Sequence, residues 1–184
     1  MDVVWIDKLE VARRQIVAAV RLFFEEGDPV AIHTLVAPAH QVLTDIGEEK
    51  GVHGAIKSAK ALQGPDAKKY LQQINFAFNF MKHADNDADS KINITPLLQL
   101  PSDFLMDAIL LLQLITGKLP IEAKVFWIWF VSTRPKEFED SLPDGPIKEM
   151  QQMGVEKWDF KTIRQFLVFA DVAGDVALAK TEKL

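Results

Sequence analysis

The sequence feature that most constrains the fold is the break formed by Gly27, Asp28 and Pro29 between two long apolar patterns. Glycine ends helices. Aspartate followed by proline starts them, because the carboxylate caps free amide groups and proline fits the first helical position. Apolar residues recur at three- and four-residue intervals over residues 6–26 and again over 29–46. Two helices with so short a connection must pack against each other as an antiparallel pair.

The same spacing predicts further helices along the chain. A segment from about Ser102 to Ile115 is apolar on almost all sides, which places it at the centre of a bundle. Residues 121–133 carry a dense aromatic patch that we assign to the core, with a subunit interface as the alternative. We also expect helices over about 55–62, 65–84, 147–153 and 159–171, with loops between them.

Composition agrees with one globular domain. The 184 residues are 48% hydrophobic and 26% charged, which is enough apolar material for a real core. No repeat and no second domain are evident. We therefore predict an all-α protein, a single domain over residues 1–184, built as an up-and-down bundle of roughly five to seven helices.

Several classes of function are disfavoured by composition. The net charge of −5, with no strongly basic half, does not indicate general binding of nucleic acids. The absence of cysteine excludes a disulfide scaffold, a cysteine zinc site and a thiol nucleophile. No apolar run is long enough to span a bilayer, and the first residues lack the pattern of a signal peptide. We expect a cytoplasmic protein that does not enter a membrane.

Chemically, the most distinctive segment is residues 75–95, NFAFNFMKHADNDADSKINIT. Asn79 and His83 are four residues apart, so a helix would place them on one face. Asp85, Asp87 and Asp89 follow in alternation, and short polar side chains of this kind end helices. Asn75 precedes Asn79 by the same spacing, so the segment predicts two amides and an imidazole on one helix face, next to a cluster of carboxylates.

One interpretation of this segment is a nucleic-acid site. His83 would act as the general acid or base on a ribose or phosphate, because the pKa of imidazole suits that role near neutral pH. Asn79 would position the substrate. The neighbouring aspartates argue against this interpretation, since they repel phosphates.

A second interpretation is a metal site that combines His83 and Asp87 with His33 and His40, which lie seven residues apart on the second predicted helix. Imidazole and carboxylate suit zinc, manganese or iron. No compact ligand motif is present, and the aspartate run lacks the glycine and glutamate of a calcium loop. The sequence does not identify a cofactor.

A third interpretation is structural. His83 would lie near the C-terminus of its helix, where a cationic ring is favourable by roughly 0.3–1 kcal/mol. His33 and His40 would be partly buried, with their ring nitrogens bonded to neighbouring groups. No site is then needed to explain the residues.

Parts of the chain resemble a known family. A regularly spaced apolar helix followed by EEGDP and IHTLVAPAHQVLTDI resembles the opening helical hairpin of HEPN domains. The order KLEVARRQIVAAVRLFFEEGDPVAIHTLVAPAHQVL also resembles a set of uncharacterised bacterial proteins that share an N-F-x-K-H-A-D stretch, here Asn79 to Asp85. The resemblance implies a helical bundle that dimerises. Many HEPN members are ribonucleases that use an arginine and a histidine on one helix, and here Asn79 is the polar residue one turn before His83.

These observations lead to three functional hypotheses. The first is a helical binding or interaction module, linked by the resemblance alone to toxin–antitoxin or phage-defence systems. The second is a HEPN-type ribonuclease with His83 as general acid or base. The third is a metal-binding bundle that uses His33, His40, His83 and Asp87. We expect a homodimer, with RNA or another protein as a further partner.

Overall fold

The computed structural model describes residues 3–55, 76–83, 85, 87–95, 101–138, 154 and 157–169, and this part of the chain contains helices and no strand. The all-α prediction is therefore confirmed there. The named helices are α1 (Lys8–Phe24), α2 (Pro29–Glu49), α4 (Pro101–Thr116), α5 (Ile121–Thr133) and the short α6 (Pro135–Phe138). Residues 76–82 and 160–169 are also helical. Apart from Ala55, which is not helical, the helices expected over 55–62 and 147–153 lie outside the described residues, as do residues 65–75 of the helix expected over 65–84.

Helix α1 starts and ends by identifiable contacts. The carboxylate of Asp7 caps its first turn by accepting the amide of Glu10 at 2.7 Å. The helix ends at Phe24, before the predicted residue 26, and Glu26 takes the positive φ of 56°. Gly27 is still required, because a Cβ there would lie 3.0 Å from the carbonyl oxygen of Leu22.

Helix α2 begins as predicted, with Asp28 accepting the amide of Val30 at 2.7 Å and Pro29 in the first turn. The predicted end at residue 46 was wrong, because the helix continues through Gly47 to Glu49. Gly47 does not break the helix. Instead it lets the chain fold back closely, with the amide of Val52 donating to the carbonyl of Gly47 at 2.8 Å. A Cβ on Gly47 would lie 2.7 Å from the Val52 carbonyl oxygen.

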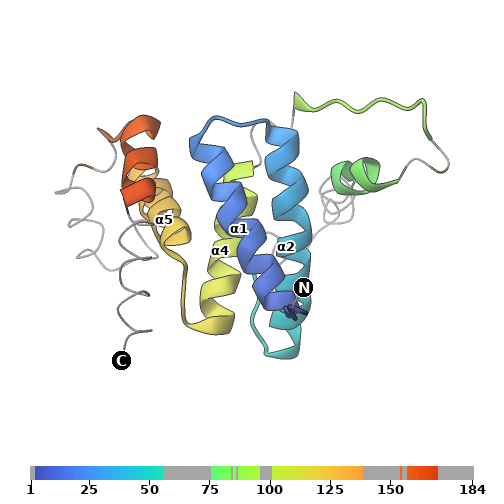
Figure 1. Ribbon diagram of the computed structural model, residues 1–184, viewed down its shortest axis with the longest axis horizontal. Helices are drawn as coiled ribbons and strands as arrows, with labels where there is room; N and C mark the ends of the chain where they lie inside the picture. Colours follow the sequence, from blue (N-terminus) through green and yellow to red (C-terminus); the bar gives the residue numbers. More distant parts are fainter. Residues whose placement is uncertain are drawn as a thin grey trace.

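The core surrounds α4, as its all-round apolar sequence predicts. Leu105, Ile109 and Leu111 are fully buried, and α4 packs against α1, α2 and α5. Helices α1, α2 and α4 lie side by side, and α5 flanks them (Figure 1). No helix in the described part of the chain has the length and apolar character that crossing a bilayer requires.

The aromatic patch of α5 lies mainly in the core, as predicted. The ring of Phe126 is buried and packs at 5.2 Å from Phe23 and 5.9 Å from Phe24, between ring centroids. Trp129 and Phe160 extend the same cluster, at 5.1 and 5.5 Å from Phe23. These contacts join α1 and α5 to the segment 160–169. The aromatic cluster therefore lies where α1 ends, whereas α1 begins and α4 ends at the opposite end of the bundle (Figure 1).

Candidate functional site

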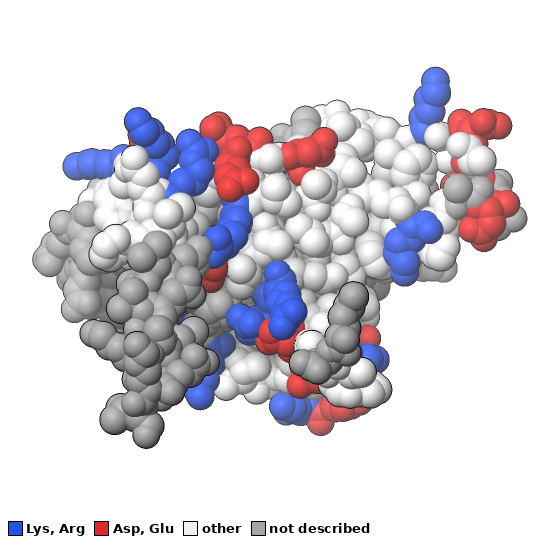
Figure 2. Space-filling view, in the orientation of Figure 1, with Lys and Arg blue, Asp and Glu red and all other residues white. Residues whose placement is uncertain are grey.

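His83 lies on the surface. The helical segment ends at residue 82, so His83 lies directly after the helix, near its C-terminus, and its amide donates to the carbonyl oxygen of Asn79 at 3.2 Å. The His83 side chain is 60% exposed, and its Nδ1 lies 3.8 Å from Oδ1 of the exposed Asp85. Asn79 is exposed as well. Carboxylates gather at this extremity of the molecule (Figure 2).

The surroundings of His83 do not orient its ring for catalysis. Among the described residues, none forms a hydrogen bond with its ring, and a catalytic imidazole needs a partner that fixes its orientation. The neighbouring Asp85, Asp87 and Asp89 are exposed carboxylates that repel a phosphate backbone. The surface around His83 is therefore poorly suited to cleave RNA.

His33 and His40 lie in the interior, at 1% and 0% exposure. The ring of Phe104 packs against both, with centroid distances of 5.7 and 5.0 Å. Two histidines sealed in the core do not meet the exposed His83 and Asp87. The described residues contain no group of three or more His, Asp or Glu side chains placed to hold a metal ion.

His40 belongs to a buried polar network that the sequence only hinted at. Its Nε2 lies 2.7 Å from Oδ2 of Asp107 on α4, and Oδ1 of Asp107 accepts the amide of Ala55 at 2.6 Å. The network joins the segment that follows α2 to helix α4. Gly54 is needed at this point, because a Cβ there would lie 2.6 Å from Oδ2 of Asp107. Asp107 was visible in the sequence as the one carboxylate within the apolar run from Phe104 to Ile115.

A hydroxyl completes a chain of groups that superficially resembles a nucleophilic triad. Oγ1 of Thr44 lies 3.5 Å from Nδ1 of His40. However, this hydroxyl donates to the carbonyl of His40 at 2.8 Å, inside its own helix. His40 and Asp107 are only 0% and 3% exposed, so no substrate reaches them. The network is structural.

His33 has a different environment. Neither of its ring nitrogens has a hydrogen-bond partner among the described residues. Burial lowers the pKa of His33, because a charged imidazolium loses its hydration inside the core. The ring is therefore neutral at physiological pH. The expectation that both buried histidines are bonded to neighbours holds for His40 and fails for His33.

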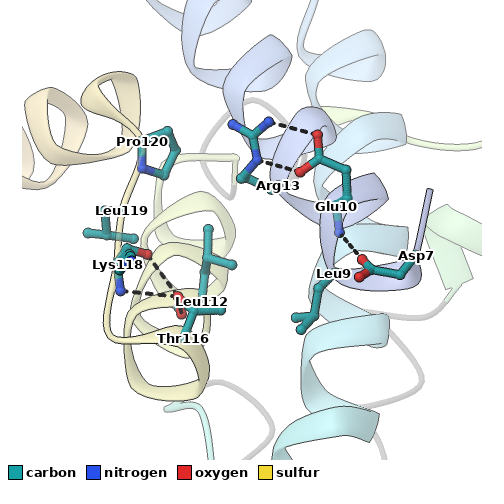
Figure 3. A pocket seen from close by; sticks show the side chains of 9 residues that line it. All are labelled: Asp7, Leu9, Glu10, Arg13, Leu112, Thr116, Lys118, Leu119 and Pro120. Carbon is teal, nitrogen blue, oxygen red and sulfur yellow. Dashed lines mark hydrogen bonds and ion pairs between the residues drawn. The ribbon is translucent and has the colours of Figure 1, made fainter. Parts of the chain in front are cut away.

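A surface cavity lies where α1 begins, α4 ends and α5 begins (Figure 3). Its volume is about 340 Å³. Leu9, Leu112, Leu119 and Pro120 supply apolar walls. The remaining lining residues are polar or charged: Asp7, Glu10, Arg13, Thr116 and Lys118.

The charges on the α1 side of this cavity are fixed by an ion-pair cluster. Glu10 accepts two hydrogen bonds from Arg13 and one from Arg14, all at 2.7 Å. These bonds, led by that from Arg13, lower the pKa of Glu10 to about 2. Basic and acidic side chains lie side by side near the start of α1 (Figure 2). Glu10 and Arg13 therefore stay ionised at any working pH.

On the α4–α5 side of the cavity, a hydroxyl group stabilises the turn that follows α4. Oγ1 of Thr116 donates to the carbonyl of Leu112 at 2.7 Å and lies 2.8 Å from the carbonyl oxygen of Lys118. Gly117 takes the positive φ of 70° that this turn requires. The ammonium of Lys118 forms no ion pair with any residue that the structure describes. A rigid turn thus presents an unpaired cation beside apolar walls.

An exposed apolar segment adjoins the cavity. Val3, Val4, Trp5 and Ile6, which we call the apolar arm, precede the capping residue Asp7, and Trp5 is 89% exposed. The sequence had placed Ile6 on the buried face of the first helix, but α1 starts only at Lys8. Contiguous exposed apolar side chains of this kind are typical of interaction surfaces.

No protein-family model, curated protein or solved structure matches this chain. The resemblance to HEPN domains stays a prediction carried by the residues quoted above. What separates the candidate sites is the environment of their own side chains: His83 is solvated, His33 and His40 are sealed in the core, and the cavity at the start of α1 is open to a ligand.

Proposed function

We propose that the chain is a helical interaction module that binds an apolar protein segment in the cavity between α1, α4 and the start of α5. The observation that carries the proposal is the apolar cavity of about 340 Å³ at the end of the bundle, bordered by the exposed apolar arm. Concave apolar sites with a few fixed polar groups are the usual form of binding sites.

The lining residues indicate what such a segment contains. Leu9, Leu112 and Leu119 favour an aliphatic or aromatic side chain. The unpaired ammonium of Lys118 favours a carboxylate close to that side chain, or the face of an aromatic ring. Arg13 is already engaged by Glu10, so Lys118 is the stronger determinant of charge.

Binding of 1-anilinonaphthalene-8-sulfonate to the folded protein tests the proposal. This probe joins apolar rings to an anion, which matches the cavity. The wild type and Trp5→Ser are both titrated, because the exposed indole competes for the same walls. We expect saturable binding at one site in at least Trp5→Ser.

The control variants locate that site. Leu119→Lys places a charge in the cavity wall and should abolish saturable binding. Leu114→Lys introduces the same charge at an exposed position of α4 outside the cavity and should leave binding unchanged. Absence of saturable binding in both the wild type and Trp5→Ser would overturn the proposal. Equal binding by Leu119→Lys and Leu114→Lys would also overturn it.

A further inference from the structure

We infer that the segment bound in this cavity is the apolar arm of a second copy of the chain, with Trp5 of each copy inserted into the cavity of the other. The inference rests on the proposed function and names its partner. The arm and the cavity meet at Asp7, which directly follows the arm and lines the cavity. Each copy therefore carries both halves of one interface at the same end of the bundle.

The arm of one chain does not fill the cavity of that same chain. Asp7 has the extended conformation of a capping residue, with φ −91° and ψ 174°, and its carboxylate is held by the amide of Glu10 at 2.7 Å. The chain before Asp7 leaves on the side away from Leu119 and Pro120 (Figure 3). In this conformation the arm leaves the cavity of its own chain open, so the arm of a second copy can enter it with both caps intact.

The chemistry of the arm matches that of the cavity. The indole of Trp5 is 89% exposed, and the walls formed by Leu9, Leu112 and Leu119 are apolar. Lys118 is a cation at the rim that can stack on an indole face. The arm and the cavity therefore match in apolar surface, and Lys118 adds a cation that suits the aromatic ring.

Symmetry closes the assembly at two copies. One arm and one cavity per chain, related by a twofold axis, satisfy each other and leave neither half free. Burial of a tryptophan alone removes about 150–250 Å² from water. Two exchanged tryptophans contribute about 300–500 Å², and the other arm residues together with the cavity rims must supply the remainder of the roughly 1,200–2,000 Å² that specific complexes bury.

A cysteine cross-link tests the arrangement, because the chain has no cysteine of its own. Val4→Cys and Leu119→Cys are prepared as separate full-length proteins and mixed in equal amounts under mild oxidation. We expect a disulfide between the two different chains. The matched pair of Val4→Cys with Leu114→Cys should give little of this product, since Leu114 lies outside the cavity.

The double variant Val4→Cys/Leu119→Cys separates exchange between chains from folding back within one chain. Exchange gives a covalent dimer, whereas folding back gives a monomer with an internal disulfide. An internal disulfide would overturn the inference. Equal cross-linking of Val4→Cys to Leu119→Cys and to Leu114→Cys would also overturn it.

Analytical ultracentrifugation gives the second readout. We expect a concentration-dependent dimer for the wild type and a monomer for Trp5→Ser, with the same thermal transition in dilute protein. Phe169→Ser removes another exposed aromatic side chain and should leave the dimer intact. A dimer that survives Trp5→Ser would contradict arm exchange.

The inference and the proposed function fail differently. A monomeric wild type that still binds the anilinonaphthalene probe at the cavity overturns arm exchange and leaves the interaction module standing. Loss of probe binding in both the wild type and Trp5→Ser overturns both.

Discussion

Nε2 of His40 and Oδ2 of Asp107 lie 2.7 Å apart in the interior, although the two residues are 67 positions apart in the chain. This contact joins α2 to α4, and the second oxygen of Asp107 holds the amide of Ala55. The pair fixes the path of the chain after α2. It has no solvent access, so its effect is on stability rather than on chemistry.

Removing one partner of this pair should destabilise the folded protein. We expect Asp107→Ala to lower the free energy of unfolding by about 3–5 kcal/mol, because the buried His40 ring and the Ala55 amide lose their acceptor. Urea denaturation measures the change. Asp45→Ala removes an exposed carboxylate from α2 and should have a much smaller effect. Similar losses in the two variants would contradict a structural role for the pair.

His33 should make the protein sensitive to acid. Burial holds its pKa in the folded state below the ordinary value of 6.5, so the unfolded chain binds a proton first as the pH falls. Stability is therefore unaffected above pH 6.5 and declines below it, by at most about 1.4 kcal/mol per pH unit, until the folded-state pKa is reached.

Urea midpoints measured across this pH range, in the wild type and His33→Leu, isolate the contribution of that ring. The two proteins share every other ionisable group, so the difference between the two curves belongs to His33. We expect the wild type to lose more stability than His33→Leu on acidification. Parallel curves would show that the ring is not held neutral by burial.

The central position of α4 is tested by a truncation in the core. Leu111 is fully buried, so Leu111→Ala should cost about 2–5 kcal/mol through lost burial and the cavity left behind. Leu114, on the same helix, is mostly exposed, and Leu114→Ala should change stability by less than about 0.5 kcal/mol. Thermal unfolding compares the two. A wild-type melting temperature for Leu111→Ala would refute the assignment.

Lys118 should make self-association depend on salt. The stacking of its ammonium on the indole of the neighbouring arm is an electrostatic contact, so added salt should weaken the dimer. We expect Lys118→Gln to form a weaker dimer with a smaller salt dependence in sedimentation experiments. Lys161→Gln, an exposed lysine on the segment 160–169, serves as the control and should behave as the wild type. The same salt response in both variants would remove Lys118 from the interface.

The helical architecture was predictable where local signals are strong. Asp28 and Pro29 mark the start of α2, and the all-round apolar sequence of α4 requires a central position. The end of α2 was missed because Gly47 serves a close approach by Val52, which no helix-propensity argument contains. A glycine in a sequence does not say whether it ends a helix or admits a neighbour.

The candidate site was less predictable. Periodicity placed Asn79 and His83 on one face but could not say whether another element covers that face, and both proved exposed. The partner of His40 is distant in the chain, so spacing could not identify it. The cavity combines residues 7–13 with 112–120 and has no pattern within either segment. Such sites arise from packing between helices.

The most direct test of the cavity as a binding site is nuclear magnetic resonance of the Trp5→Ser protein during titration with an end-blocked peptide of residues 1–8. The account predicts that amide shifts concentrate at the cavity, at Leu9, Leu112 and the turn from Thr116 to Leu119. The same peptide with serine in place of tryptophan should produce no such shifts. Shifts centred elsewhere, or equal shifts with both peptides, would contradict the claim that this cavity receives the apolar arm.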